Sequence, residues 1–307
     1  MDFDIEELED KIIVKMSLSY MEIARASLFI KGTPKLNGKN IGTIGEIEIE
    51  NKDDGAELLK KCCEVLKGKG VKYIVGPMNR TTWNEYRSIK KSEKDPMFLM
   101  ENVASKEVTD AFKKADFDEI HTYTSSKGKI KDGYSDEVLD ELYEEAKKDG
   151  ITIRNFNKKK AHEELTNMFE VAKQSFKLNP LYTDIKEEEF IAKYEKYIDL
   201  CDERLILIAE KNKKVIGFLF SMPNINMEKP DAKINAIILK TIAVKPEFED
   251  YALGNIMLNK IKEEALELGY RDWIFAFMYK NNTSQRMSAR NKAKDIREYS
   301  LFGKELK

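Results

Sequence analysis

The chain has 307 residues, of which 42% are hydrophobic and 35% are charged, which is enough for two domains with apolar cores. A net charge of −2 and a pI near 6.0 argue against nucleic acid or an anionic membrane as a partner. The acidic start at 1–7 has no signal-peptide pattern, and no run approaches the roughly 18 apolar residues that span a membrane. We therefore expect a cytoplasmic protein that binds neither nucleic acid nor membrane, with its oligomeric state left open.

The cysteines and histidines predict no metal site. Cys62, Cys63 and Cys201 lack the spacing of metal ligands and favour reduced, structural thiols. His121 and His162 are the only histidines, and no Ser-His-Asp grouping can be built around them. No catalytic side chain lies near His121 in the sequence, so we interpret it as an ordinary strand residue.

The first 127 residues predict an α/β domain. Residues 1–11 are interpreted as a short acidic helix or frayed end. Strands are predicted from apolar patterning at 11–17, 22–31, 42–50, 71–75 and 118–125. Helices are predicted at 53–66, capped by Asp53 and Asp54, and at 105–115, capped by Ser105.

The run that follows Val75 has the composition of a binding loop. It reads Gly76-Pro77-Met78-Asn79-Arg80-Thr81-Thr82-Trp83 and places glycine, proline and aromatic residues at a strand end. The alternative is that Trp83, Tyr86 and Met97 cap a core, because aromatic side chains pack more often than they bind ligands.

A linker helix is expected at 128–149, since a polar stretch with two glycines precedes a charged helical pattern that Gly150 ends. The second half, 150–307, then starts with a strand at 151–154. Two amphipathic helices follow at 161–176 and 186–199, with a loop at 177–183 between them. Two more strands, at 205–210 and 215–221, precede the central unit.

That central unit is a strand, a loop, a helix and a second strand. The apolar run at 236–244 stops before Pro246 and predicts a buried strand. Helical spacing of apolar residues from Leu253 to Leu268, with Gly269 as the C-cap, predicts a helix that leads into a strand at 273–279. The N-terminus of such a helix presents free N–H groups and favours phosphate.

The order Val244-x-Pro246, Gly254, helix, Gly269-Tyr270 and strand to Asn281-Asn282 resembles the acetyl-coenzyme A binding core of the GNAT acyltransferase superfamily. The resemblance implies that the first strand splays from its neighbour, that its backbone pairs with pantetheine, and that the loop wraps the pyrophosphate. The cofactor-binding residues that it implies are Ile242, Ala243, Val244, Asp250, Tyr251, Ala252, Leu253, Gly254, Asn255, Asn282 and Ser284.

The loop departs from the family pattern at two positions. Glu249 stands where the family has Gln or Arg, and a carboxylate about 4 Å from a phosphate costs about 1 kcal/mol in water and about 4 at an effective dielectric of about 20. Glu249 must therefore point away from the pyrophosphate. Ala252 replaces the first glycine, and this is less serious, because alanine is tolerated at ordinary φ/ψ, whereas a required positive φ would penalise it.

The family's usual general acid is a Tyr about seven residues after the Asn that ends the second strand, and here that position falls on Ser288 or Ala289. Tyr279 and Ser288 are therefore the candidate catalytic residues, with Ser284 and water as alternatives. The general base is not identified, and Glu203, Glu228 and Tyr182 are the candidates.

The strand-loop-helix-Gly-strand order also occurs in the first half, where Gly70 corresponds to Gly269. Its loop at 51–55 carries two acids that repel pyrophosphate. Through Gly76-Pro77-Met78-Asn79 and the following Thr82-Trp83, the chain resembles bacterial two-domain GNAT-like proteins, which implies an α/β (α+β) fold of two tandem domains, each a mixed twisted sheet flanked by helices. It also implies that the domain at 1–127 is degenerate and that 150–307 is the acyltransferase domain.

The same resemblance implies that the groove between the domains holds the acceptor, with Asn79, Trp83, Asn179 and Tyr182 as substrate-binding residues. The preferred function is transfer of an acetyl or other acyl group from acetyl-CoA to a small-molecule or peptide amine, by direct attack in a ternary complex. Alternatives are a ligand-binding protein without catalysis and an aminoacyl transferase of the peptidoglycan-bridge type. Arg297 binds an anionic group or pairs with a neighbouring acid.

Overall fold

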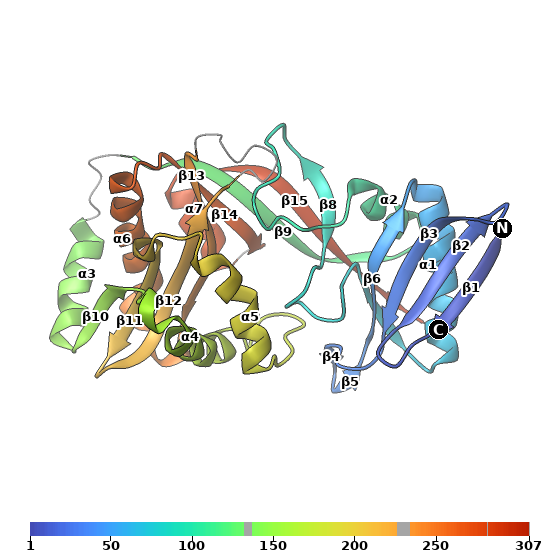
Figure 1. Cartoon of the computed structure of the whole chain (residues 1–307), viewed down its shortest axis with the longest axis horizontal. Coiled ribbons are helices and arrows are strands. Elements are labelled where there is room, and N and C mark those ends of the chain that lie inside the picture. Colours follow the sequence, from blue (N-terminus) through green and yellow to red (C-terminus); the bar gives the residue numbers. More distant parts are fainter. Residues whose placement is uncertain (132–136, 226–233, 281, 307) are drawn as a thin grey trace.

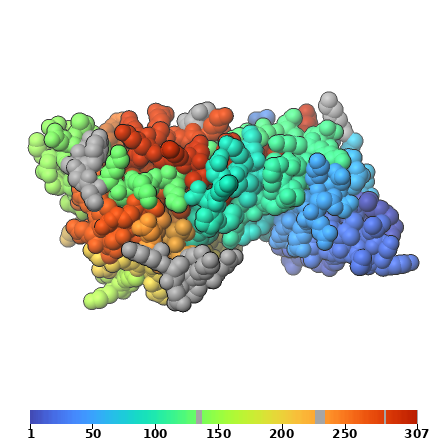
Figure 2. Space-filling model, turned by 90° about the horizontal axis from the view of Figure 1, so that it is seen from above, coloured from blue at the N-terminus to red at the C-terminus, as the bar shows by residue number. Residues whose placement is uncertain are grey.

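The computed structural model describes residues 1–131, 137–225, 234–280 and 282–306. Within them, one mixed sheet of 13 strands runs through an elongated molecule in the order β1-β2-β3-β6-β7-β15-β9-β14-β13-β12-β11-β10, with β8 beside β15 (Figures 1 and 2). The predicted α/β class, a mixed sheet flanked by helices, is confirmed.

The N-terminal half supplies one end of this sheet. Its strands are β1 (Asp2–Glu7), β2 (Ile12–Leu18), β3 (Met21–Phe29), β6 (Gly42–Ile49), β7 (Tyr73–Gly76), β8 (Ser88–Ser92) and β9 (Asp118–Lys129), with a small hairpin of β4 (Lys35–Leu36) and β5 (Lys39–Asn40). Helices α1 (Lys52–Gly68) and α2 (Lys106–Lys114) pack on one face over a core that includes Val14, Leu59 and Phe112.

The C-terminal half supplies the other end. Its strands are β10 (Ile151–Asn155), β11 (Ile206–Lys211), β12 (Lys214–Pro223), β13 (Ala236–Val244), β14 (Asp272–Tyr279) and β15 (Lys294–Glu305). Its helices are α3 (Glu137–Lys148), α4 (Ala161–Ser175), α5 (Glu187–Ile198), α6 (Leu253–Glu267) and α7 (Thr283–Arg290), with 3₁₀ turns η1 (Lys158–Lys160), η2 (Glu203–Leu205) and η3 (Pro246–Tyr251).

Helices cover both faces of this second half, as Figure 1 shows. Ile238 belongs to the core beneath α4 and α5, whereas its neighbour Leu239 belongs to the core beneath α3 and α6. Successive side chains of a strand point to opposite faces, so a strand buried on both sides is continuously apolar. This accounts for the apolar run that the sequence shows in β13.

The two halves of the chain share strands at the centre of the sheet. Strand β15 lies between β7 and β9, with Phe302 opposite Gly76 and Tyr299 opposite Tyr123, while β9 also pairs with β14. The C-terminus thus returns to the end of the molecule that holds the N-terminus (Figure 1).

Three local predictions were wrong. Residues 2–7 form an edge strand on β2, not a helix, because pairing with β2 outweighs a weak local helical preference. Helix α1 is capped by Asn51, whose side chain accepts the N–H groups of Asp53 and Asp54, since the cap must precede the first turn in extended conformation. Strand β9 continues past its predicted end at Ser125 to Lys129, because β14 and β15 pair with residues beyond Ser125.

Candidate active site

Strands β13 and β14 separate after a short parallel contact. Their pairing begins at Ala236 opposite Asp272 and ends at Leu239 opposite Phe275. Beyond that point β14 follows β9, with a register shift between Phe275 and Met278 and a positive φ of 54° at Phe277. The backbone of Ile242, Ala243 and Val244 therefore faces an opened edge, because among the described strands it pairs there with β12 alone.

A β-bulge in β13 lies next to this opening. Phe220 is opposite Thr241 and Ser221 is opposite Leu239, so Lys240 is an extra residue without a partner in β12. Bulges re-aim side chains beside functional sites. Lys240 is only partly exposed, and its ammonium lies 5.1 Å from the ring centroid of Tyr194. Burial, reinforced by neighbouring positive charges, lowers the pKa of Lys240 to about 8.

The loop between β13 and α6 is compact. It forms η3 and then passes through Ala252, whose φ of +52° is left-handed and whose N–H donates to the carbonyl of Glu249. A left-handed residue joins η3 to α6, so the penalty that a positive φ imposes on alanine applies at Ala252. The Tyr251 hydroxyl donates to Asp149 at 2.7 Å and ties the loop to the end of α3.

The start of α6 has features that suit a phosphate. Its first turn carries no acidic residue, and both Glu249 and Asp250 before it are exposed. A Cβ on Gly254 would lie 3.0 Å from Cε of Met287 and 3.4 Å from Cγ2 of Ile242, so the helix start packs closely on β13 and α7. Leu253 is buried in the core below, and Asn255 is half-buried on the first turn.

Helix α7 places Asn282 and Ser288 differently. Asn282 is the N-cap, accepting the N–H of Gln285 at 3.1 Å, and it lines a cavity beside β13. Ser284 is half-buried on the first turn, whereas Ser288 is 3% exposed and lines neither cavity described below. Asn281 lies outside the described residues.

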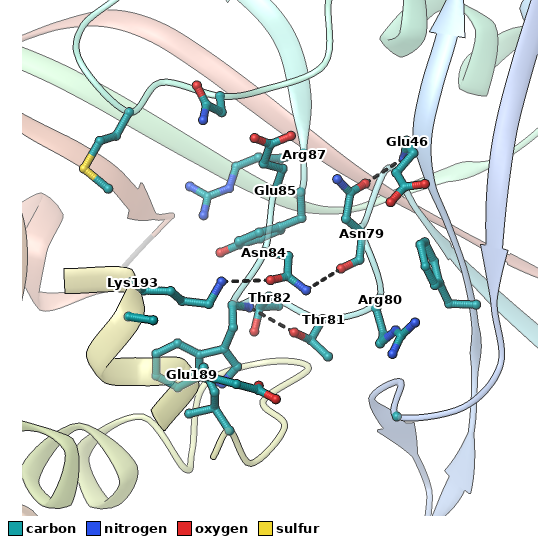
Figure 3. Close-up of a pocket in the computed structure, with 18 of the residues that line it drawn as sticks. Glu46, Asn79, Arg80, Thr81, Thr82, Asn84, Glu85, Arg87, Glu189 and Lys193 are labelled. Atoms are coloured by element: carbon teal, nitrogen blue, oxygen red, sulfur yellow. Dashed lines mark hydrogen bonds between the residues drawn. The ribbon is translucent and has the colours of Figure 1, made fainter. Parts of the chain in front are cut away.

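Two adjacent cavities lie between the halves of the chain, with volumes of about 270 and about 1150 Å³. The smaller one brings together Trp83, Asn179, Tyr182, Tyr279 and Asn282, which the sequence analysis nominated separately. Thr241 and Lys240 from β13 complete its wall. The larger one is shown in Figure 3. Six residues line both cavities: Thr82, Trp83, Tyr86, Lys193, Lys240 and Phe277.

Trp83 joins the N-terminal half to the segment between α4 and α5. Its indole N–H donates to the carbonyl of Thr183 at 2.8 Å, and its ring lies about 6 Å from those of Phe176 and Phe190. Trp83 therefore packs against a core and also lines the cavities. The binding-loop interpretation and the core-capping interpretation of this residue do not exclude each other.

Asn79 lines the larger cavity but its side chain secures the loop, because Oδ1 accepts the N–H of Glu46 at 2.7 Å. The Asn79 carbonyl accepts from Asn84, and Asn84 in turn accepts from the Lys193 ammonium at 2.9 Å (Figure 3). This chain of contacts connects β6 to α5 across the groove.

The interpretation of His121 is corrected by its contact with Tyr279. The Tyr279 hydroxyl lies 3.1 Å from Nδ1 of His121, and burial lowers the pKa of this histidine, so the imidazole is neutral at pH 7. The two residues are on adjacent strands, β14 and β9, a pairing that no local pattern indicates.

Other candidates are not placed for catalysis. Burial and Asp184 raise the pKa of Tyr182 to about 12, which keeps its hydroxyl protonated. Glu203 lies in η2 and lines neither cavity, and Glu228 falls outside the described residues. Arg297 forms an ion pair with Glu101, with Nε 2.6 Å from Oε1. Of the two alternatives for Arg297, pairing with an acid of the protein is therefore the one observed.

Sequence reasoning missed Lys240 and Arg87. A single charged residue inside the apolar run of β13 was a usable signal for Lys240, whereas Arg87 has no comparable local signal. The three cysteines are free thiols, and the described part of the chain holds no cluster of three His, Cys, Asp or Glu that could bind a metal. None of the described helices is long and apolar enough to cross a membrane.

Comparison with known proteins defines the class. Residues 164–291, which include β13, α6 and β14, match the model of the acetyltransferase (GNAT) family. Comparison with curated proteins gave no match.

Among solved structures, the fold resembles a GCN5-related glucosamine N-acetyltransferase region of a fungal multi-domain GH3 β-N-acetylglucosaminidase, with a TM-score of 0.57 and 13% identity over 96% of this chain and 33% of that one. It also resembles a GCN5-related N-acetyltransferase from Sphaerobacter thermophilus, with a TM-score of 0.54 and 10% identity over 97% of this chain and 81% of that one. A tandem GNAT protein from the clavulanic acid biosynthesis pathway gives a TM-score of 0.52 at 10% identity, over 96% of this chain and 82% of that one. The chain thus has a tandem GNAT fold and spans one third of the first of these proteins.

Proposed function

We propose that the protein is an acyl-coenzyme A-dependent N-acyltransferase that transfers an acetyl or other acyl group to a small-molecule or peptide amine in a ternary complex. The observation that carries this proposal is the opened edge of β13 beside the start of α6, leading into the cavity that holds Tyr279. These features fit a coenzyme A thioester, which supplies an activated acyl group when bound.

The proposed donor site uses the backbone of Ile242, Ala243 and Val244 for the pantetheine arm. The loop residues Asp250, Tyr251 and Ala252 and the helix start at Leu253, Gly254 and Asn255 would hold the pyrophosphate, with Asn282 and Ser284 beside them. N–H groups of β13 would orient the carbonyl and stabilise its developing negative charge.

The reaction forms one carbon–nitrogen bond and breaks one carbon–sulfur bond. The acceptor amine loses a proton to solvent water, and the departing sulfur gains one. We assign that second proton to the hydroxyl of Tyr279, with His121 in the Nδ1–H tautomer donating to the phenol oxygen and leaving the phenol proton free. Ser288, buried outside both cavities, has no role in this scheme.

We further propose that 150–307 carries the donor site, that 1–127 is a degenerate copy forming the opposite wall of the groove, and that 128–149 connects them. The contrast between the two helix starts supports this division. Helix α1 begins with Asp53 and Asp54, which repel phosphate, whereas the first turn of α6 has no acid.

Thermal unfolding with and without acetyl-CoA tests the donor site. Ligand at about 100 times the dissociation constant stabilises by about 2.7 kcal/mol, and each kcal/mol moves the midpoint of a protein this size by roughly 2 to 4 °C. We expect Gly254→Trp to abolish the shift. Gly68→Trp is the control, because a Cβ added at this glycine in α1 would meet no atom within 4 Å and would lie in open space.

The absence of any shift with millimolar acetyl-CoA would refute the donor site. It would favour a ligand-binding protein that has lost catalysis, the alternative to which the left-handed Ala252 points. A shift in the unfolding midpoint without acetylation of any amine would mean that the protein binds acetyl-CoA but does not catalyse the transfer.

A further inference from the structure

Arg87 is a buried cation that has no counter-ion among the residues that the structure describes. Arg87 is 8% exposed. Its guanidinium carbon lies 3.8 Å from the ring centroid of Tyr86, 4.5 Å from that of Tyr123 and 4.3 Å from that of Phe277. Neither Nε nor Nη1 has a hydrogen-bond partner among the described residues. Buried charged donors are normally paired, because an unpaired one keeps the cost of its lost hydration. Two unsatisfied donors at a cavity wall therefore point to an acceptor group on a ligand.

Lys240 adds a second cation to the same region. It lines both cavities, and the charged side chains that act on it, Arg87, Lys193 and Lys196, are all positive. Lys193 is engaged by Asn84 and lies near Glu85 and Glu189. The unbalanced positive charge is thus centred on Arg87 and Lys240.

The carboxylates of the groove lie at its rim. Those that line the larger cavity all belong to exposed residues: Asp10, Glu46, Glu85, Asp184 and Glu189. Figure 3 shows Arg87 and Lys193 on the opposite side of the pocket from Glu46. No carboxylate lines the smaller cavity within the described residues. The rim is mixed in charge, and the interior is cationic and aromatic.

We propose that Arg87 and Lys240 bind the carboxylate or phosphate group of the acceptor, so that the substrate is an amine that carries a negative charge. This inference rests on the proposed acyltransferase function. Arg87 lines only the larger cavity, whereas Thr241, Tyr279 and Asn282 line only the smaller one, and Lys240 lines both. An acceptor that reaches Tyr279 from the larger cavity would place its amine at the smaller cavity and its anionic group beside Arg87.

The test uses pairs of amines that differ only in the anionic group. Tyrosine with tyramine and phosphoethanolamine with ethanolamine are suitable, assayed for acetyl transfer and for binding to the full chain with coenzyme A present. We expect the wild type to favour the anionic member of at least one pair by about 10- to 100-fold in kcat/KM or affinity, the range expected for charge-assisted hydrogen bonds. Arg87→Met and Lys240→Met should each bring the ratio close to one.

Lys186→Met is the matched control, because it removes one positive charge from an exposed residue of the same cavity and should leave the ratio unchanged. Equal use of both members of every pair by the wild type, or an unchanged ratio in Arg87→Met and Lys240→Met, would overturn the proposal. A charge preference that follows the acyl group instead, seen as succinyl-CoA over acetyl-CoA and lost in Arg87→Met, would also overturn the assignment to the acceptor.

Failure of the proposed function is recognised separately. If acetyl-CoA does not bind, the anion site is still measured by stabilisation against thermal unfolding in inorganic phosphate or acetate. The site predicts a shift in the wild type and in Lys186→Met that is reduced in both Arg87→Met and Lys240→Met. Equal shifts in all four proteins would contradict it, whatever the fate of the acyltransferase proposal.

Discussion

The hydroxyl of Tyr279 lies 3.1 Å from Nδ1 of His121, although 158 residues separate the two in the chain. Tyr279→Phe removes only the hydroxyl, so we expect acetyl-CoA to stabilise the variant as it does the wild type. We expect kcat for acetyl transfer to fall about 100-fold or more, the usual contribution of a general acid. Tyr73→Phe, outside both cavities, is the control. A kcat within threefold of wild type would remove Tyr279 from the mechanism.

His121 should make stability depend on pH in the acid range. Its pKa is lowered from the ordinary 6.5 by burial, so below that pH the unfolded chain binds the proton more readily than the folded protein. This contribution to stability is complete above about pH 6.5 and is lost as the pH falls through the lowered pKa. When urea unfolding is measured at pH 7.5 and at pH 5, the free energy of unfolding should fall less in His121→Gln than in the wild type. The exposed His162→Gln should behave like the wild type, and identical losses in both variants would count against this prediction.

Lys240 predicts a stability change at alkaline pH. Its pKa of about 8 lies below the ordinary 10.5 because of burial and the charges of Arg87, Lys193 and Lys196, so the folded protein releases this proton first. The contribution of Lys240 to the free energy of unfolding is therefore least favourable below about pH 8, and it becomes more favourable as the pH rises towards 10.5. At pH 7 we expect Lys240→Met to raise the unfolding free energy by about 1 to 3 kcal/mol, with the gain shrinking by pH 10. Denaturant titrations at both pH values check this, and a gain that is independent of pH would disprove the linkage.

Ala252 offers a test of backbone strain. A left-handed conformation costs a non-glycine residue about 1 to 2 kcal/mol, and Ala252 has a φ of +52°. After the entropic cost of glycine, Ala252→Gly should still raise the unfolding free energy by about 0.5 to 1 kcal/mol. The same change at Ala192, exposed within α5, should lower it by about 1 kcal/mol. Chemical denaturation of both variants decides the sign, and losses in both would show that the loop is not strained.

Arg297 and Glu101 form an ion pair with side chains that are 1% and 0% exposed. Arg297→Met leaves a buried carboxylate without its partner, so we expect a loss of about 3 to 5 kcal/mol in unfolding free energy. Restoring neutrality with Glu101→Gln in the same chain should recover part of that loss. For comparison, Lys106→Met breaks an exposed pair with Asp110 and should cost less than about 1 kcal/mol. Similar costs for the two pairs would contradict the role of burial.

Much of the architecture could be predicted from the sequence. Apolar spacing located β13 and α6, Pro246 and Gly269 marked their ends, and the resemblance of this unit to the GNAT core agreed with the family match. Composition also singled out Trp83, and the resemblance implied Asn179 and Tyr182; all three line one cavity. These features are local, because periodicity, caps and turn residues act over one or two turns of chain.

What only the tertiary structure decided is how distant segments meet. The sharing of β15 between β7 and β9, the contact of His121 with Tyr279 and the unpaired Arg87 among aromatic rings depend on strand order and register. A shift of one residue in register turns a side chain to the opposite face, so such contacts have no signature in the local pattern. The sequence by itself therefore determined the class of fold and the position of its central unit, and the packing of β9, β14 and β15 determined which side chains face the groove.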